Sequence, residues 1–269
     1  MFIYSIWNDI CQEIVQYNTI KVEEILKQPK NSTWIAVKHD VETNVSKALE
    51  LARIEAKYGI NATYYVQSYL LDENYELLQI IQSLGHEVTY HYDVLDANAG
   101  NMEKAIVDFD KNIAKFKQYG FNVKTVCPHG NPVMIRNGWN SNKDFFRNEK
   151  VQTLYPHILD IVIQLPKKID YLYISDAGYG FKKIGNIRDN DLKNIGDIEI
   201  SDYRELLKSF SENKRIILST HPHRWEKNIM TFIMRVYLFK FLRIVARVLS
   251  KLPILKNIIS KYYYLAKKI

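Results

Sequence analysis

Short apolar segments alternate with longer segments of helical periodicity from about residue 34 to residue 220. The short segments are rich in β-branched and aromatic residues and end at polar or turn residues, a pattern that predicts β-strands. The predicted strands are Trp34–Val37, Ala62–Val66, His86–His91, Val123–Cys127, Tyr171–Ser175 and Arg215–Thr220. Strands that alternate with helices imply right-handed βαβ units and therefore a parallel sheet, either open or closed into a barrel.

The longer segments carry apolar residues at three- and four-residue steps, together with helix-capping signals. The predicted helices run from a cap at Asn44 to a stop at Gly59, over Tyr75–Leu84, and over Met102–Tyr119. Asp202 and Glu205 resemble a capping box and predict one more helix start. Residues 128–150 contain Gly, Asn and Pro and are predicted to form a long loop.

Polar side chains cluster at one kind of position, at or just after the end of a predicted strand. They are Asp40, Glu42, His91, Asp93, His129, Asp176 and His221. The C-terminal ends of parallel strands lie on one rim, where α/β proteins bind their ligands. We therefore expect these residues, although spread over about 180 positions, to converge on one site.

This set of residue types has the chemistry of a divalent-metal site. Asp40 and Glu42 are two residues apart, so in an extended segment they point the same way; one can bind metal while the other acts as a base. His91 can supply a nitrogen ligand. A third ligand is needed, because catalytic zinc typically takes three protein ligands and one water. The metal would acidify that water and polarise a carbonyl oxygen.

Six segments of the chain, in this order, resemble motifs of the polysaccharide deacetylase (NodB-homology, carbohydrate esterase family 4-like) superfamily. They are Lys38–Glu42, Ala52–Glu55, Gly59–Tyr65, Gly85–His91, Pro128–Pro132 and Ser219–Trp225. The resemblance covers about residues 33–225 and is to a branch associated with surface-polysaccharide biosynthesis. It implies an irregular (β/α) barrel of about seven parallel strands.

The resemblance also implies a reaction, the hydrolysis of an N-acetyl group on an amino sugar. Asp40 would be the general base, Glu42 and His91 would bind a divalent metal ion, expected to be zinc, and His221 would protonate the leaving amine. Asp176 lies on the same predicted rim, and we count it among the catalytic candidates.

The chain departs from the usual family pattern at three places. The second ligating histidine is expected four residues after the first, where this chain has Leu95. Val41 separates two acids that are adjacent in the usual pattern. The usual Arg-Pro-Pro loop is replaced by Cys127-Pro128-His129, which makes His129 the candidate for the missing ligand.

Each candidate also has an ordinary structural role available. Asp40 and Glu42 can cap the helix that follows, His91 can bond to backbone at a strand end, and His129 and Asp176 can be turn residues. A decayed metal site would leave a different kind of protein, a non-catalytic module that binds a glycan or a partner. The metal content of the protein with and without His91→Ala distinguishes the two functions.

Two further histidines lie beside these motifs and are given no part in the site. His39 alternates away from Asp40 and is expected to be structural, whereas His86 begins a strand after a glycine and is expected to be exposed to solvent.

Charge divides the chain into a near-neutral body and a basic tail. The formal net charge is +7, but residues 226–269 carry ten Lys or Arg and one acid. We expect residues 1–225 to form the barrel domain and residues 226–269 a basic amphipathic helical tail, broken into two helices at Pro253. Such a tail can lie in an anionic membrane surface, which would place the site beside a lipid-linked glycan. The alternative is that the tail covers the barrel.

Other features bear on the compartment and the partners. Two cysteines fit a reducing compartment, residues 1–16 show no leader, and basic residues interrupt the longest apolar segment, Ile229–Leu249. We expect a cytoplasmic protein attached peripherally to the inner face of the cell membrane. No base-reading or aromatic-stacking motif is present, so nucleic acid is not an expected partner.

Overall fold

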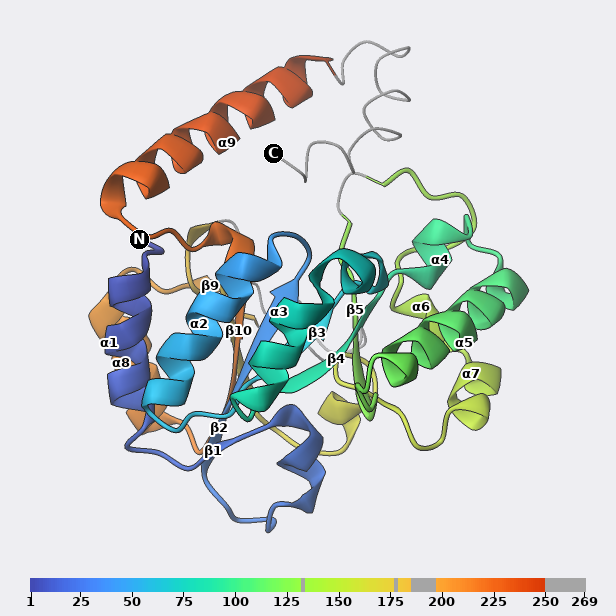
Figure 1. The fold of residues 1–269 in the computed structure, drawn as a ribbon, viewed down its shortest axis with the longest axis horizontal. Helices are drawn as coiled ribbons and strands as arrows, with labels where there is room; N and C mark the ends of the chain where they lie inside the picture. Colours follow the sequence, from blue (N-terminus) through green and yellow to red (C-terminus); the bar gives the residue numbers. More distant parts are fainter. Residues whose placement is uncertain (132–133, 177–178, 185–196, 250–269) are drawn as a thin grey trace.

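A mostly parallel β-sheet forms the centre of the molecule (Figure 1). The computed structural model describes residues 1–131, 134–176, 179–184 and 197–249. The strands are β1 (Thr19–Ile20), β2 (Trp34–Val41), β3 (Thr63–Val66), β4 (Glu87–Tyr92), β5 (Thr125–Pro128), β6 (Leu159–Asp160), β7 (Leu172–Ser175), β8 (Lys182–Lys183), β9 (Ile198–Glu199) and β10 (Arg215–Thr220). Their order is β6-β5-β4-β3-β2-β10-β7-β8-β9, with β1 paired to β2.

Seven of these strands, from β6 across to β7, pair in parallel throughout. The predicted α/β fold with about seven parallel strands is therefore confirmed. All six predicted strands are present, and β10 has the predicted bounds. The strands that the sequence pattern did not predict, β1, β6, β8 and β9, have two residues each, too few to show a periodicity.

Helices cover the outer face of the sheet: α2 and α3 lie side by side in front of the strands, and α5 lies beyond α3 and packs against β4 (Figure 1). The helices are α1 (Tyr4–Ile14), α2 (Val45–Lys57), α3 (Leu71–Ser83), α4 (Val94–Ala97), α5 (Met102–Gln118), α6 (Asp144–Arg147), α7 (Glu149–Leu154), α8 (Tyr203–Glu212) and α9 (Ile229–Leu249). Short 3-10 turns are η1 (Val22–Lys27), η2 (Ser68–Leu70), η3 (Leu165–Lys167) and η5 (Pro222–Arg224). The long loop predicted over residues 128–150 ends earlier than expected, because α6 and the start of α7 occupy its last part.

The helix ends follow the predicted capping chemistry. The side chain of Asn44 accepts a hydrogen bond from the backbone N–H of Lys47 at the start of α2, so the cap comes from this residue and not from Asp40 or Glu42. Gly59, at φ +69°, ends the turn that follows this helix, in a conformation that favours glycine. Asp202 caps α8 through the N–H of Glu205.

The central strands, β5, β4, β3, β2 and β10, bury both of their faces, in two separate cores. All eight residues of β2 are buried, with Ile35 and Val37 in the core under the helices, and Trp34 and Ala36 in the core inside the curved sheet. The inner core consists of Ile20, Val22, Ile25, Trp34, Ala36, Tyr65, Cys127, Ile161, Leu165 and Ile217. The apolar part of the interior thus lies toward the strand starts, and polar residues occupy the strand ends.

The barrel is irregular between β6 and β7. Among the described residues no backbone pairing joins these two strands. A side chain spans the interval instead, since the hydroxyl of Tyr171 donates to the carbonyl of Ile161 over 3.3 Å. Apolar residues on both sides, among them Leu159 and Tyr173, pack against the inner core.

The described part of the predicted helical tail is α9, which projects from the body beside the N-terminus (Figure 1). Phe232 on its first turns packs against the core, with its ring centroid 6.3 Å from that of Phe2. The predicted break at Pro253 lies outside the described residues. Within the described part of the chain, no helix has the length and apolar character needed to cross a membrane.

Candidate active site

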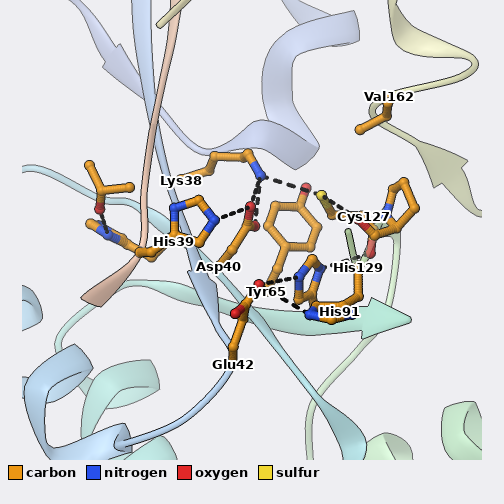
Figure 2. Close-up of polar contacts among 12 residues, drawn as sticks. Lys38, His39, Asp40, Glu42, Tyr65, His91, Cys127, His129 and Val162 are labelled. Carbon is orange, nitrogen blue, oxygen red and sulfur yellow. Dashed lines mark hydrogen bonds and ion pairs between the residues drawn. The ribbon is translucent and has the colours of Figure 1, made fainter. Parts of the chain in front are cut away.

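The residues predicted to form the site meet inside the barrel at the C-terminal ends of the strands. Asp40 lies in β2 and Glu42 just after it; His91 lies in β4; His129, Asp176 and His221 follow β5, β7 and β10. Asp40, Glu42, His91 and His129 are turned toward one another (Figure 2). The parallel pairing of β10, β2, β3, β4 and β5 brings these ends to one rim.

Glu42, His91 and His129 form the group best suited to a metal ion. One ligand atom of each residue lies within 4.8 Å of the others. Oε1 of Glu42 is 3.2 Å from Nε2 of His129 and 3.9 Å from Nε2 of His91. Ligands about 2.0–2.1 Å from a tetrahedral zinc ion are about 3.3 Å apart, so the donor set and its spacing fit such an ion with one position left for water.

The orientation of His91 is set by the strand next to it. Its Nδ1–H donates to the backbone carbonyl of Cys127 over 3.0 Å, which leaves Nε2 turned toward the carboxylates. Burial lowers the pKa of His91, but Asp40, the bond to Cys127 and Glu42 outweigh burial and raise this pKa to about 10. The surroundings of His91 therefore favour a positive charge.

His129 is held by the loop that follows β5. Its backbone N–H donates to the carbonyl of Tyr92, and its carbonyl accepts from the side-chain amide of Asn142 over 2.9 Å. Asn142 in turn bonds to the buried Asp96, which also accepts two hydrogen bonds from Arg136. A buried polar network of this kind fixes the position of a loop.

Leu95, at the position where the family pattern expects a ligand, lies away from the site. It is 1% exposed and belongs to the hydrophobic core under the helices. That side chain cannot bind a metal ion. His129, which follows β5, places its Nε2 3.2 Å from Oε1 of Glu42 instead.

Asp40 sits deeper in the barrel and is paired with Lys38. The Nζ of Lys38 lies 2.7 and 2.8 Å from the two carboxylate oxygens of Asp40 (Figure 2). Burial raises the pKa of Asp40, but the charges of Lys38, His91 and His221 outweigh it and hold this pKa well below its usual value. Asp40 is therefore ionised, as a residue that accepts a proton or a hydrogen bond must be.

His221 approaches Asp40 from the opposite side to His91. Its Nε2 is 3.9 Å from Oδ2 of Asp40, and its Nδ1–H donates to Oδ1 of Asp176 over 2.6 Å. Asp176 is fully buried; it also accepts from the backbone N–H of His221 and from Arg224. Asp176 thus orients the imidazole and keeps its Nε2 directed into the site.

The two histidines given no part in the site bond to residues on the helix-covered side of the sheet. His39 bonds to Thr220 and Glu55, in keeping with a structural role. The prediction that His86 is exposed is wrong: it is 3% exposed, accepts from the N–H of Ala62 and donates to the carbonyl of Ala52. The glycine before His86 ends a helix and does not mark a surface position for the residue that follows.

Sequence reasoning missed three polar residues of the site, Lys38, Cys127 and Arg224. Lys38 had a usable signal, because a residue two positions before Asp40 in a strand shares its face. Cys127 had a similar signal, because it stands two positions before His129, whereas Arg224 had none, since its place depends on its contact with Asp176 after another strand.

Comparison with known proteins gives matches in structure only. No family model and no curated protein sequence matches this chain. A family 4 carbohydrate esterase from Streptococcus mutans matches 86% of this chain and 90% of its own, at 13% identity and a TM-score of 0.46. A family 4 carbohydrate esterase from Streptomyces lividans, solved with acetate, matches 76% of this chain and 85% of its own, at 14% identity and a TM-score of 0.44.

A further match is a pseudoenzyme of the same family from Bacillus anthracis, at 13% identity and a TM-score of 0.44. It matches 80% of this chain, which spans 62% of the length of that protein. All three carry the name of the family that the sequence motifs resemble. At these identities and scores, the roles of individual residues depend on the geometry of this chain alone.

Proposed function

We propose that this protein is a metal-dependent hydrolase that removes an N-acetyl group from an amino sugar of a surface-glycan intermediate. The observation that carries the proposal is the grouping of Glu42, His91 and His129 around one point, with Asp40 and His221 beside it. The residues fit a divalent ion, and zinc is the expected one because the set offers two imidazole nitrogens and a carboxylate oxygen.

The chain supplies each part of an amide hydrolysis. A divalent ion held by Glu42, His91 and His129 would supply polarisation of the amide carbonyl and acidification of a water. Asp40, ionised beside Lys38, accepts the proton or hydrogen bond of the attacking water. His221, oriented by Asp176, donates a proton from Nε2 to the leaving amine.

The test is metal content and acetate release, in the wild type and in two histidine variants. His91→Ala should lose bound metal and release of acetate from an N-acetylglucosamine oligomer. His86→Ala is the matched control, since His86 is equally buried but has both ring nitrogens bonded to backbone. A wild type that binds the oligomer without metal and without turnover would support the non-catalytic module instead.

We also propose that α9 docks this protein on an anionic membrane. The side chains that point away from the body form one apolar face, with exposed fractions between 62% and 75%: Met230, Met234, Tyr237 and Phe241. Steps of four, three and four residues place them on one side of the helix. Residues 226–269 carry ten basic residues and one acid, which complements anionic headgroups.

Vesicle co-sedimentation of the full-length chain tests this docking. We expect binding to phosphatidylserine-containing vesicles that weakens with salt and is largely lost in a Met234→Ser, Phe241→Ser double variant. Val107→Ser is the control, because Val107 is 69% exposed on α5. Equal binding by the double variant, or a stable dimer without vesicle binding, would refute the proposal. Contact with a membrane would bring the site near a lipid-linked glycan.

A further inference from the structure

A second group of potential metal ligands lies directly beneath the first. Asp40, His91 and Cys127 also offer ligand atoms within 4.8 Å of one another, and all three are buried. This inner group shares His91 with the first group, Glu42, His91 and His129. One imidazole cannot direct the same nitrogen to both points, so something must decide between the two groups.

Lys38 places a cation at the inner group. Its side chain is 0% exposed, and its Nζ lies 2.7 and 2.8 Å from the oxygens of Asp40 and 3.3 Å from Sγ of Cys127 (Figure 2). The same nitrogen is 5.2 Å from the ring centroid of Tyr65 and 5.8 Å from that of Tyr173. These are distances at which aromatic faces stabilise a cation.

We propose that Lys38 acts as a built-in cation that occupies the inner group, keeps Asp40 and Cys127 away from the metal, and so assigns the ion to Glu42, His91 and His129. The inference rests on the proposed metal site and adds to it the reason why that site is chosen. The thiol of Cys127 is a soft ligand for zinc, and a thiolate beside an imidazole and a carboxylate would otherwise compete strongly. Lys38 is a positioning residue, because it acts through Asp40 and Cys127.

Removing the charge of Lys38 should open the inner group. Lys38→Met has a chain of similar length and no charge. In this variant Cys127 can become a ligand, so the protein loaded with Co²⁺ should gain the near-ultraviolet absorption of a cobalt–thiolate bond. The wild type should bind one equivalent of Co²⁺ without that absorption, and Cys127→Ser in the wild-type background should bind Co²⁺ with unchanged affinity.

Two controls connect the absorption to these residues. The double variant Lys38→Met, Cys127→Ser should lose the cobalt–thiolate absorption. Lys47→Met, which removes a half-buried lysine paired with Glu226 outside the barrel, should not produce this absorption.

Cobalt–thiolate absorption in the wild type would overturn the proposal, since Cys127 would already be a ligand. Its absence in a folded Lys38→Met variant would do the same. A wild type that binds no Co²⁺ contradicts the metal-dependent function, and cobalt–thiolate absorption on Lys38→Met would then still support the role of Lys38. If Lys38→Met does not fold, the wild-type spectrum and the affinity of Cys127→Ser decide the matter.

Discussion

Two clusters of this protein contain the same residue types, one glutamate and two histidines, on opposite faces of the same sheet. The Glu42 cluster is Glu42, His91 and His129. The Glu55 cluster is Glu55, His39 and His86. The residue types are alike and all four histidines are buried, yet only the Glu42 cluster offers its ligand atoms to a common point.

In the Glu55 cluster, the carboxylate is fully hydrogen-bonded by side chains of the protein. Glu55 accepts from Trp7, His39 and Tyr64 over 3.0, 2.7 and 2.7 Å. Burial raises the pKa of Glu55, but the neighbouring His39 and the hydrogen bonds outweigh it, so this pKa is lowered overall. A carboxylate that accepts this many short hydrogen bonds is already satisfied without a metal ion. Its role is to hold α1, α2 and the sheet together.

In the Glu42 cluster, hydrogen bonds position the histidines without engaging the nitrogens that face Glu42. The Nδ1–H of His91 donates to the carbonyl of Cys127, so its Nε2 faces Glu42, and the carbonyl of His129 accepts a hydrogen bond from Asn142. The protein thus fixes the ring of His91 and the backbone of His129 from behind, and leaves the ligand atoms facing one another. Whether a Glu–His cluster is structural or functional depends on where its hydrogen bonds go, not on its composition.

Paired glutamate variants give the sharpest separation of the two clusters. Glu42→Gln should lose metal and nearly all activity while the metal-free protein keeps its stability. Glu55→Gln should keep one equivalent of metal but lose about 3 kcal/mol of unfolding free energy, because it weakens a buried, charge-assisted network. Metal analysis and thermal unfolding with and without a chelator measure both effects. Loss of metal from a folded Glu55→Gln variant would contradict the assignment of the Glu55 cluster to a purely structural role.

His221→Ala should lower turnover by about 10²- to 10⁴-fold, as expected for removal of a general acid, at unchanged metal content. The reason is that His221 faces Asp40 at 3.9 Å and lies outside the group of metal ligands. Steady-state kinetics and metal analysis of one preparation are sufficient. Loss of metal would make His221 a ligand, and full turnover would remove it from the chemistry.

Asp176→Asn should have a smaller effect of the same kind, about 10- to 100-fold on turnover, by analogy with the cost of removing the hydrogen-bond partner that orients a metal-bound imidazole. The bond from Nδ1 of His221 to Asp176 holds one tautomer, and an amide holds it less well. The measurement is turnover with substrate affinity followed in parallel. A variant that loses affinity but not turnover would show that Asp176 shapes the binding surface instead.

The smallest expected effect concerns pH and another buried carboxylate, Glu87. Burial raises its pKa to about 7; Glu23 adds to this, and bonds to Thr63 and Thr125 oppose it. The folded protein therefore holds a proton that the unfolded chain releases above its ordinary pKa of 4.5. Stability from this group is fully present below pH 4.5 and is lost as pH rises to about 7, by at most a few kcal/mol at about 1.4 kcal/mol per pKa unit.

Glu87→Gln should remove that part of the pH dependence. Denaturant unfolding of the metal-free protein between pH 5 and 8 measures it, with Glu73→Gln on an exposed position of α3 as the control. An unchanged slope in Glu87→Gln would show that Glu87 is already ionised in the folded protein.

The sequence by itself determined the alternation of strands and helices and the location of polar residues at strand ends. These features follow from periodicity and capping within a few residues, as at Asn44, Gly59 and β10. The convergence of Asp40, His91 and His221 also followed, because parallel strands have only one C-terminal rim.

Tertiary structure alone decided which side chains share a point. His129 rather than Leu95 approaches Glu42, because α4 turns Leu95 into the outer core while β5 delivers His129 to the interior. His86 is buried because α2 covers it, and Lys38 reaches Cys127 because β2 and β5 face each other across the barrel. Contacts between residues this far apart in the chain depend on strand order and curvature, which local patterns of apolar and polar residues do not encode.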